Sequence, residues 1–204
     1  FYLSDYGFGH ASRAIAIVRA LQRSIGDLRI IIKAAGTYDF LRAALDCEVV
    51  YTRNDVGVVL RSGTLAVDRD ATERIFRQWV ATWPEYIRRE EQFLTQQRVD
   101  LILSDIVPQS FIAASCLGIP SVAVSNFTWY SIYHHLFGST AETEAFAEAY
   151  SHAHRALVLP FQEPMRNAHG ESIFADAIEV PLVSREITEG RVGMRERYGI
   201  SPED

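Results

Sequence analysis

Residues 5–13 (DYGFGHASR) bring glycines, a histidine and an arginine to the point where a short apolar run meets an amphipathic run. Glycine lets the backbone approach a ligand closely, and the free N–H groups at a helix start attract anions. His10 adds a group that can take up a proton near neutral pH. The segment therefore predicts a loop that binds phosphate or sugar groups, with His10 as a catalytic base. The alternative is a tight turn without a ligand, in which His10 is an ordinary surface or core residue.

Asp105 is the candidate partner of His10. It directly follows an apolar run at residues 99–104 that is typical of a buried strand. A carboxylate bonded to one imidazole nitrogen fixes the tautomer and leaves the other nitrogen able to accept a proton. The alternative is that Asp105 caps a helix that begins near Pro108, and both roles can hold at once.

Other candidate binding residues lie near the expected strand ends. Aromatic rings can stack on sugars, an amide side chain both donates and accepts hydrogen bonds, and an arginine can reach a phosphate or carboxylate. For the aromatic residues, hydrophobic cover of the sheet end is an equal alternative. The candidate substrate-binding residues are Gly7, Phe8, Gly9, Arg13, Arg61, Asn126, Phe127 and Trp129.

The glycine loop does not match two common nucleotide-binding motifs. A dinucleotide fingerprint needs a third glycine, where this chain has Ser12, and an acidic residue at the end of the second strand, where it has Lys33-Ala34-Ala35. The phosphate-binding loop of nucleotide hydrolases needs a G-K-[ST] sequence, which does not follow. The histidines do not cluster with acidic or thiol side chains in a metal-ligand pattern. We expect neither a cofactor nor a metal.

Composition excludes some other classes. The 204 residues carry a net charge of −6, which argues against a non-specific nucleic-acid binder. Apolar runs stay short of the roughly 20 residues that cross a bilayer, so we expect no integral membrane segment. The sequence does not show the pattern of a secretory signal, and we expect a cytoplasmic protein.

Short β-rich runs alternate with helical patterns along the chain. This alternation predicts an α/β fold, a Rossmann-like open and mainly parallel sheet with helices on both faces. Strands are expected at residues 1–4, 28–35, 48–51, 99–104, 121–125 and 155–159, with a last strand or a linker at 178–183. Helices are expected at residues 11–21, 37–45, 70–97, 109–117, 131–137, 141–154 and 189–198. Pro84 is expected to break or kink the third of these helices after Trp83.

The loops after three expected strands carry the candidate residues. Parallel sheets bind ligands beyond the carboxyl ends of their strands, so residues 5–10, 105–108 and 126–129 should meet at one edge. Residues 1–183 are expected to form one domain, and residues 184–204 a linker helix toward a C-terminal domain outside this chain. The sequence opens inside an expected strand and closes on a turn after an expected helix, and we expect a piece of a longer protein.

Three motifs together resemble a known family. They are the G-F-G-H-A-S-R loop at residues 7–13, S-D-I-V-P at residues 104–108, and the stretch at residues 117–129 that ends in N-F-T-W. These residues are similar to the N-terminal, acceptor-side half of glycosyltransferases with the GT-B fold. The likeness is strongest to the glycosyltransferase-like N-terminal part of L-arabinokinases and to bacterial predicted glycosyltransferases, and it covers most of the chain.

The resemblance implies a function and partners. The intact protein would transfer a sugar from a nucleotide-diphosphate donor to a hydroxyl acceptor, with His10 as base, Asp105 orienting it, and residues 7–13 facing the donor phosphates. The donor half would lie in the missing C-terminal domain, so this fragment alone should be inactive. The alternative is a non-catalytic module that binds a sugar or sugar phosphate for an associated sugar kinase.

Overall fold

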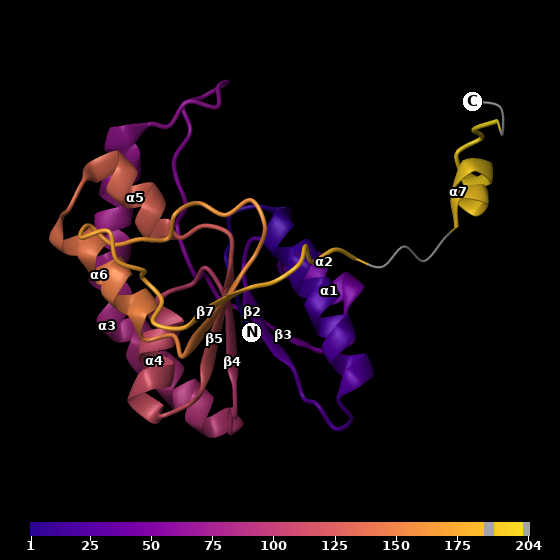
Figure 1. Cartoon of the computed structure of the whole chain (residues 1–204), viewed down its shortest axis with the longest axis horizontal. Coiled ribbons are helices and arrows are strands. Elements are labelled where there is room, and N and C mark those ends of the chain that lie inside the picture. Colours follow the sequence, from indigo (N-terminus) through magenta and orange to yellow (C-terminus); the bar gives the residue numbers. More distant parts are fainter. Residues whose placement is uncertain (186–189, 202–204) are drawn as a thin grey trace.

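The computed structural model describes residues 1–185 and 190–201. The strands are β1 (Tyr2–Leu3), β2 (Ile31–Ala34), β3 (Glu48–Tyr51), β4 (Ile102–Asp105), β5 (Ser121–Ser125), β6 (Arg155–Val158) and β7 (Ala177–Glu179). The helices are α1 (Phe8–Ser24), α2 (Tyr38–Ala44), α3 (Arg69–Gln97), α4 (Gln109–Leu117), α5 (Trp129–Phe137), α6 (Ala141–Ser151) and α7 (Arg191–Arg197). Figure 1 shows how these elements are arranged.

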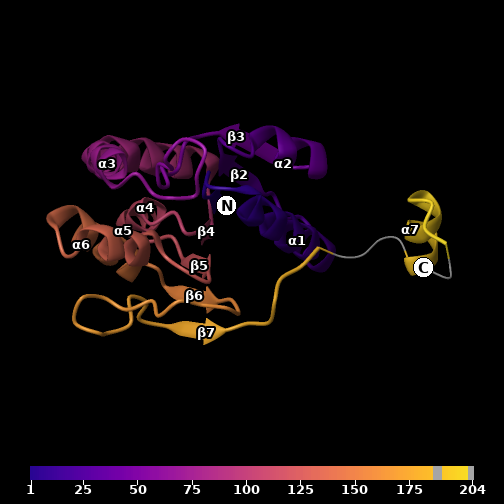
Figure 2. The ribbon, with the colours of Figure 1, turned by 90° about the horizontal axis from the view of Figure 1, so that it is seen from above.

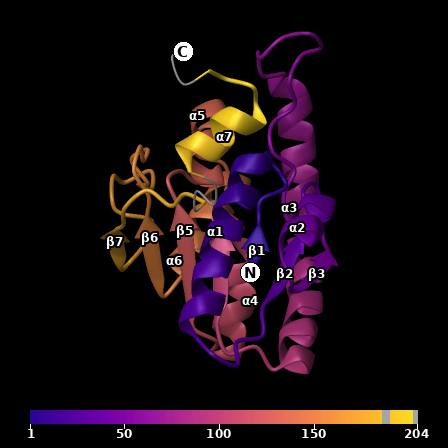
Figure 3. The ribbon, with the colours of Figure 1, turned by 90° about the vertical axis from the view of Figure 1, so that its right-hand side faces the viewer.

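The strands form one parallel sheet in the order β3-β2-β1-β4-β5-β6-β7. The chain builds outward from β1 to β3, returns along α3, and then builds outward in the other direction from β4 to β7 (Figure 3). The order therefore reverses between β1 and β4, which is where open sheets of this kind bind ligands. The predicted fold class, an open parallel sheet with helices on both faces, is confirmed.

Helices cover both faces of the sheet because alternate side chains of each strand point to opposite sides. Leu3 packs with the buried side chains of α1 and α2, whereas Tyr2 packs with those of α3 and α4. Figure 2 shows α1 and α2 on one side of the sheet and α3 to α6 on the other. A core rich in aromatic side chains fills the space among α3, α5 and α6.

The break expected at Pro84 is wrong, because α3 runs from Arg69 to Gln97 without a break. Proline removes one backbone donor from a helix interior. Trp83 before it belongs to the aromatic-rich core, and Ile87 after it packs against the same core, so both halves of α3 are anchored there. Tertiary packing thus outweighs the local cost. Pro84 itself is exposed.

Some expected boundaries differ from the structure. The first helix begins at Phe8 instead of residue 11, so His10 lies inside its first turn. The segment at residues 55–67, between β3 and α3, contains an antiparallel bridge between Leu60 and Val67. The alternative of a last strand near residue 178 is confirmed by β7. The expected helix at 189–198 is seen as α7, whereas residues 186–189 lie outside the described part.

The division into a domain at residues 1–183 and a linker at 184–204 stays a prediction. Among the residues that the structure describes, no helix is both long enough and apolar enough to span a membrane.

Candidate functional site at the carboxyl edge of the sheet

His10 is placed by a sharp turn between β1 and α1. Gly7 has φ +99°, a conformation that side chains rarely adopt, and it ends the loop directly before the helix. His10 then lies in the first turn of α1 and is only 6% exposed. The imidazole is therefore held on a rigid element at the carboxyl end of the central strand.

Asp105 is the last residue of β4, and it lies directly opposite Leu3 of β1 in the sheet register. Its carboxylate is fully buried, and Oδ1 lies 2.9 Å from His10 Nδ1. The expected proximity of the two side chains is confirmed. The alternative role of Asp105 as a helix cap is not seen, because α4 begins after Pro108 without a side-chain cap.

A strained turn fixes the position of Asp105. The next residue, Ile106, has φ +56°, which is rare for a β-branched side chain and costs about 1–3 kcal/mol. Neighbouring hydrogen bonds maintain this conformation, because the Ser104 hydroxyl bonds both the N–H and the carbonyl of Val107, and the Tyr150 hydroxyl donates to the Ile106 carbonyl. Such over-determined strain is typical of functional sites.

Arg13 completes this cluster from one turn further along α1. Its Nε lies 2.8 Å from Asp105 Oδ2 and one terminal nitrogen lies 2.7 Å from Oδ1. Burial alone would raise the pKa of Asp105, but the charges and hydrogen bonds of His10 and Arg13 outweigh it, so the pKa is lowered. Asp105 is therefore ionised at neutral pH.

The ionised carboxylate decides the tautomer of His10. Because Oδ1 can only accept a hydrogen bond, the proton of a neutral imidazole belongs on Nδ1. The Nε2 atom then keeps its lone pair. The arrangement can accept a proton from a hydroxyl group placed at Nε2, which is the action of a general base.

Three polar residues that the sequence reasoning did not single out hold the surrounding loops. The Asp5 carboxylate accepts hydrogen bonds from the N–H groups of Ala35 and Gly36 at the end of β2, and from that of Asn54. The side chain of Asn54 donates to the carbonyls of Leu3 and Lys33 and so joins β1 to β2. The pair Asn54-Asp55 closely follows β3, so the strand-end argument could have found it.

Asp55 is a second buried carboxylate near the site. It accepts hydrogen bonds from the N–H of Asp5 and from the indole N–H of Trp129, the latter at 2.9 Å. Burial raises its pKa to about 6. Asp55 thus links the loop after β3 to the start of α5.

The aromatic candidates divide between surface and core. Phe127 is partly exposed, and its ring centroid lies 5.8 Å from that of His10. Asn126 is also partly exposed, and its carbonyl accepts a hydrogen bond from the N–H of Glu163. Trp129 is fully buried, and its ring stacks on that of Tyr133. The alternative of hydrophobic cover fits Trp129, whereas Phe127 and Asn126 are accessible to a ligand beside His10.

The other candidate residues lie on exposed parts of the same edge. Phe8 is 61% exposed and its ring contacts that of Phe40. A side chain built at Gly7 or Gly9 would meet no atom within 4 Å, so open space faces the start of α1. Arg61 is exposed in the projecting loop between β3 and α3 (Figure 1). The structure brings Arg13 to His10 and places Arg61 apart in that loop.

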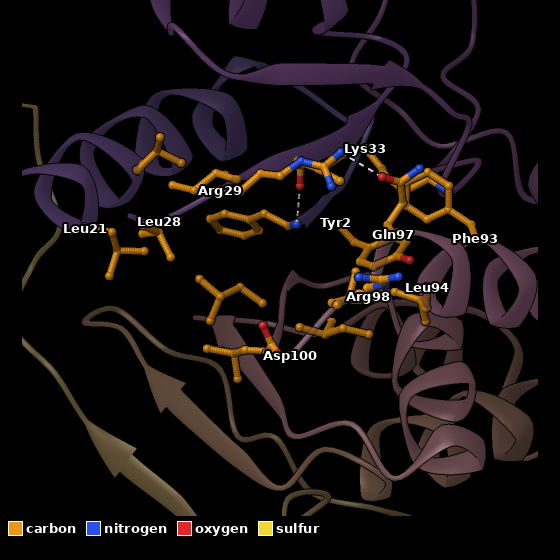
Figure 4. A pocket seen from close by; sticks show the side chains of 18 of the residues that line it. Tyr2, Leu21, Leu28, Arg29, Lys33, Phe93, Leu94, Gln97, Arg98 and Asp100 are labelled. Carbon is orange, nitrogen blue, oxygen red and sulfur yellow. Dashed lines mark hydrogen bonds between the residues drawn. The ribbon is translucent and has the colours of Figure 1, made fainter. Parts of the chain in front are cut away.

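A cavity of about 290 Å³ lies at the opposite, amino-terminal edge of the sheet. Figure 4 shows Leu21 and Leu28 on one side of it and Phe93 on the other. Lys33 lines it, and its ammonium group lies 2.6 Å from Glu90 Oε1. This buried ion pair joins β2 to α3 and is separate from the His10 cluster. In the described residues, no group of acidic, histidine or cysteine side chains could hold a metal ion.

The fold is that of one half of a GT-B glycosyltransferase. Arabidopsis thaliana UGT89C1 complexed with UDP-L-rhamnose has a TM-score of 0.55 and 12% identity, covering 92% of this chain and 52% of that chain. A second structure of Arabidopsis thaliana UGT89C1 has a TM-score of 0.50 and 12% identity, covering 96% and 52%. This chain therefore spans about half the length of those structures, and at such identity the likeness shows the fold alone.

The sequence itself matches a curated protein. It is 31% identical over 217 residues to L-arabinokinase of Arabidopsis thaliana, a match that covers 98% of this chain and 19% of that protein. No protein-family model matches the chain. The chain thus has the fold of a GT-B N-terminal domain and is homologous to part of L-arabinokinase.

Proposed function

We propose that the intact protein transfers a sugar from a nucleotide-diphosphate donor to a hydroxyl acceptor. The observation that carries this proposal is the buried pair of His10 and Asp105, with Nδ1 2.9 Å from Oδ1, at the point where the strand order reverses. His10 Nε2 takes the proton of the acceptor hydroxyl. The acceptor oxygen then forms a bond to the anomeric carbon, whose bond to the phosphate oxygen breaks, and the nucleoside diphosphate leaves.

The start of α1 supports the donor side of this proposal. The free N–H groups of its first turn attract negative charge, and no side chain of Gly7 or Gly9 blocks the approach. Phe127 and Asn126 lie on the neighbouring loop, where they can contact a sugar or an acceptor. A donor domain outside this chain would complete the site, with the acceptor bound on the side that this chain provides.

The test is turnover by the intact protein. We would incubate it with a panel of nucleoside-diphosphate sugars and hydroxyl acceptors and measure release of the nucleoside diphosphate. The proposal expects release that depends on both substrates. Binding of sugars without any release of nucleotide would contradict it.

One observation favours a second candidate function. The homologous protein is named a kinase, and this chain spans only 19% of it. A domain joined to a sugar kinase can bind a sugar or sugar phosphate and regulate the kinase without catalysing transfer. This alternative predicts sugar binding that changes kinase activity and no release of nucleotide from any donor.

A further inference from the structure

Arg13 makes a two-pronged contact with Asp105. Its Nε donates to Oδ2 at 2.8 Å, and a terminal nitrogen, Nη2, donates to Oδ1 at 2.7 Å. The planar guanidinium matches a carboxylate in this geometry, and such paired bonds are the strong form of this interaction. The carboxylate of Asp105 therefore cannot rotate away from His10.

The contact also makes burial of Asp105 possible. The carboxylate is fully buried at the end of a central strand, where an unpaired charge would be expensive. Arg13 is itself mostly buried, with 16% of its side chain exposed. The two opposite charges therefore compensate each other whether or not His10 carries a proton.

The same charge acts on His10. Nη2 of Arg13 lies 3.2 Å from His10 Nδ1, and both nitrogens point at the same oxygen of Asp105. The negative charge of Asp105 favours a protonated imidazole, and the positive charge of Arg13 opposes it. The third neighbour of the ring, Phe127, is uncharged. The charges of Asp105 and Arg13, which the described structure places beside His10, therefore largely offset each other.

We propose that Arg13 is a positioning residue, which locks Asp105 against His10 and offsets the carboxylate charge so that His10 stays neutral and able to take a proton. This inference rests on the proposed function of His10 as a base. Arg13 then acts within the protein, because its guanidinium group is directed at Asp105 and not outward to a donor phosphate.

Two substitutions in the intact protein separate the two parts of the proposal. Arg13→Gln removes both the paired hydrogen bonds and the charge, whereas Arg13→Lys keeps the charge and loses the paired hydrogen bonds. Arg13→Gln should lower kcat by part of the about 10²–10⁴-fold that a positioned base contributes, with KM for the donor nearly unchanged. It should also move the acidic limb of the pH–rate profile to higher pH, because the charge of Asp105 is no longer offset. Arg13→Lys should lower kcat and leave that limb near its original position.

The control is Arg19→Gln, which makes the same change on the exposed side of α1, where Arg19 donates a hydrogen bond to the carbonyl of Ala44. It should change neither kcat nor the pH profile. A second readout is the protonation of His10 followed by nitrogen NMR of the labelled protein, which does not require turnover. In Arg13→Gln the imidazole should take up its proton at higher pH.

The outcomes are distinguishable. If Arg13→Gln leaves both the NMR titration of His10 and the pH profile unchanged, the proposal for Arg13 is wrong, even if the protein melts earlier. If donor affinity falls and kcat does not, Arg13 binds the donor instead. If no variant or parent shows transfer but the NMR titration shifts as expected, the electrostatic role of Arg13 stands and the proposed transferase function fails.

Discussion

Two buried carboxylates near the carboxyl edge have opposite electrostatic settings. Asp105 faces His10 and Arg13, and its pKa is lowered despite full burial. Asp55 accepts hydrogen bonds from uncharged N–H groups, and burial raises its pKa to about 6. The difference follows from the partners, because the charges and hydrogen bonds of His10 and Arg13 outweigh the burial of Asp105, whereas the hydrogen bonds to Asp55 do not outweigh its burial. One carboxylate is therefore fixed as an anion, while the other can take up a proton in mildly acidic solution.

The raised pKa of Asp55 predicts a pH dependence of stability. Its pKa in the folded state is about 6, against 3.8 for an unperturbed aspartate. The folded state therefore takes up the proton first as pH falls, so the stability contributed by this group rises between about pH 6 and pH 4. Two pKa units correspond to about 3 kcal/mol.

Comparison with Asp55→Asn isolates this effect, because all other titrating groups are shared. The free energy of unfolding of the parent, minus that of the variant, should increase by up to about 3 kcal/mol as pH falls from 7 to 4. Denaturant unfolding at a series of pH values measures it. A difference that is constant with pH would show that Asp55 has an ordinary pKa.

At the scale of elements, the loops at this edge are held by polar contacts and by close backbone packing. Gly57 has φ +61°, and a Cβ atom there would lie 2.2 Å from Cδ2 of Tyr6. The carbonyl of Gly57 also accepts a hydrogen bond from the hydroxyl of Tyr133. The ring of Tyr6 in turn packs edge-on against Trp129. The loop after β3 is thus attached to the loop that leads into α1 and His10.

Gly57→Ala should therefore destabilise the domain more than a matched glycine in the same loop does. Gly63 has φ +70° and open space around its Cβ position. Both substitutions incur about 1–2 kcal/mol for the left-handed backbone, and only Gly57→Ala adds a steric clash. Thermal unfolding of the two variants measures the difference. Equal losses of stability would mean that Tyr6 does not pack on this loop.

The helices and strands were predicted well where the hydrophobic periodicity and the residues at the strand ends indicated the same boundaries. The strand before Asp105 and the helix after Gly7 were enough to bring Asp105 and His10 together. The helix at residues 70–97 was predicted, but the expected break at Pro84 is wrong, because the local effect of proline gives no sign of the core contacts of Trp83 and Ile87. The paired hydrogen bonds of Arg13 to Asp105 were also not predicted. The direction of a side chain depends on where its helix begins, and this helix begins at Phe8 and not at residue 11.

At the scale of the whole molecule, the sheet provides one edge of the proposed site, and the proposed function places the donor side in a second domain. The chain spans about half of the GT-B structures that it resembles. Domains of this kind have their own cores, and three buried clusters here pack both faces of the sheet. The candidate base is therefore in place before any second domain is added, whereas the proposed donor site is not.

This division predicts the behaviour of the chain alone. The 204-residue chain should unfold in one cooperative transition but show no turnover and only weak binding of nucleotide sugars. Calorimetry and the nucleotide-release assay, with the intact protein as the control, check both parts. Clear turnover by the isolated chain would refute the view that it is half of an enzyme.

The most direct test of the proposed mechanism is replacement of His10 in the intact protein. His10→Ala should lower kcat by about 10²–10⁴-fold, because the acceptor hydroxyl loses its base, while donor affinity and melting temperature stay nearly unchanged. Folding should survive because Arg13 still compensates the charge of Asp105. His10→Gln keeps a donor toward Asp105 and repeats the test without a cavity, and Asp105→Asn should lower kcat less than His10→Ala does. Full activity in both His10 variants would contradict the assignment of His10 as the base.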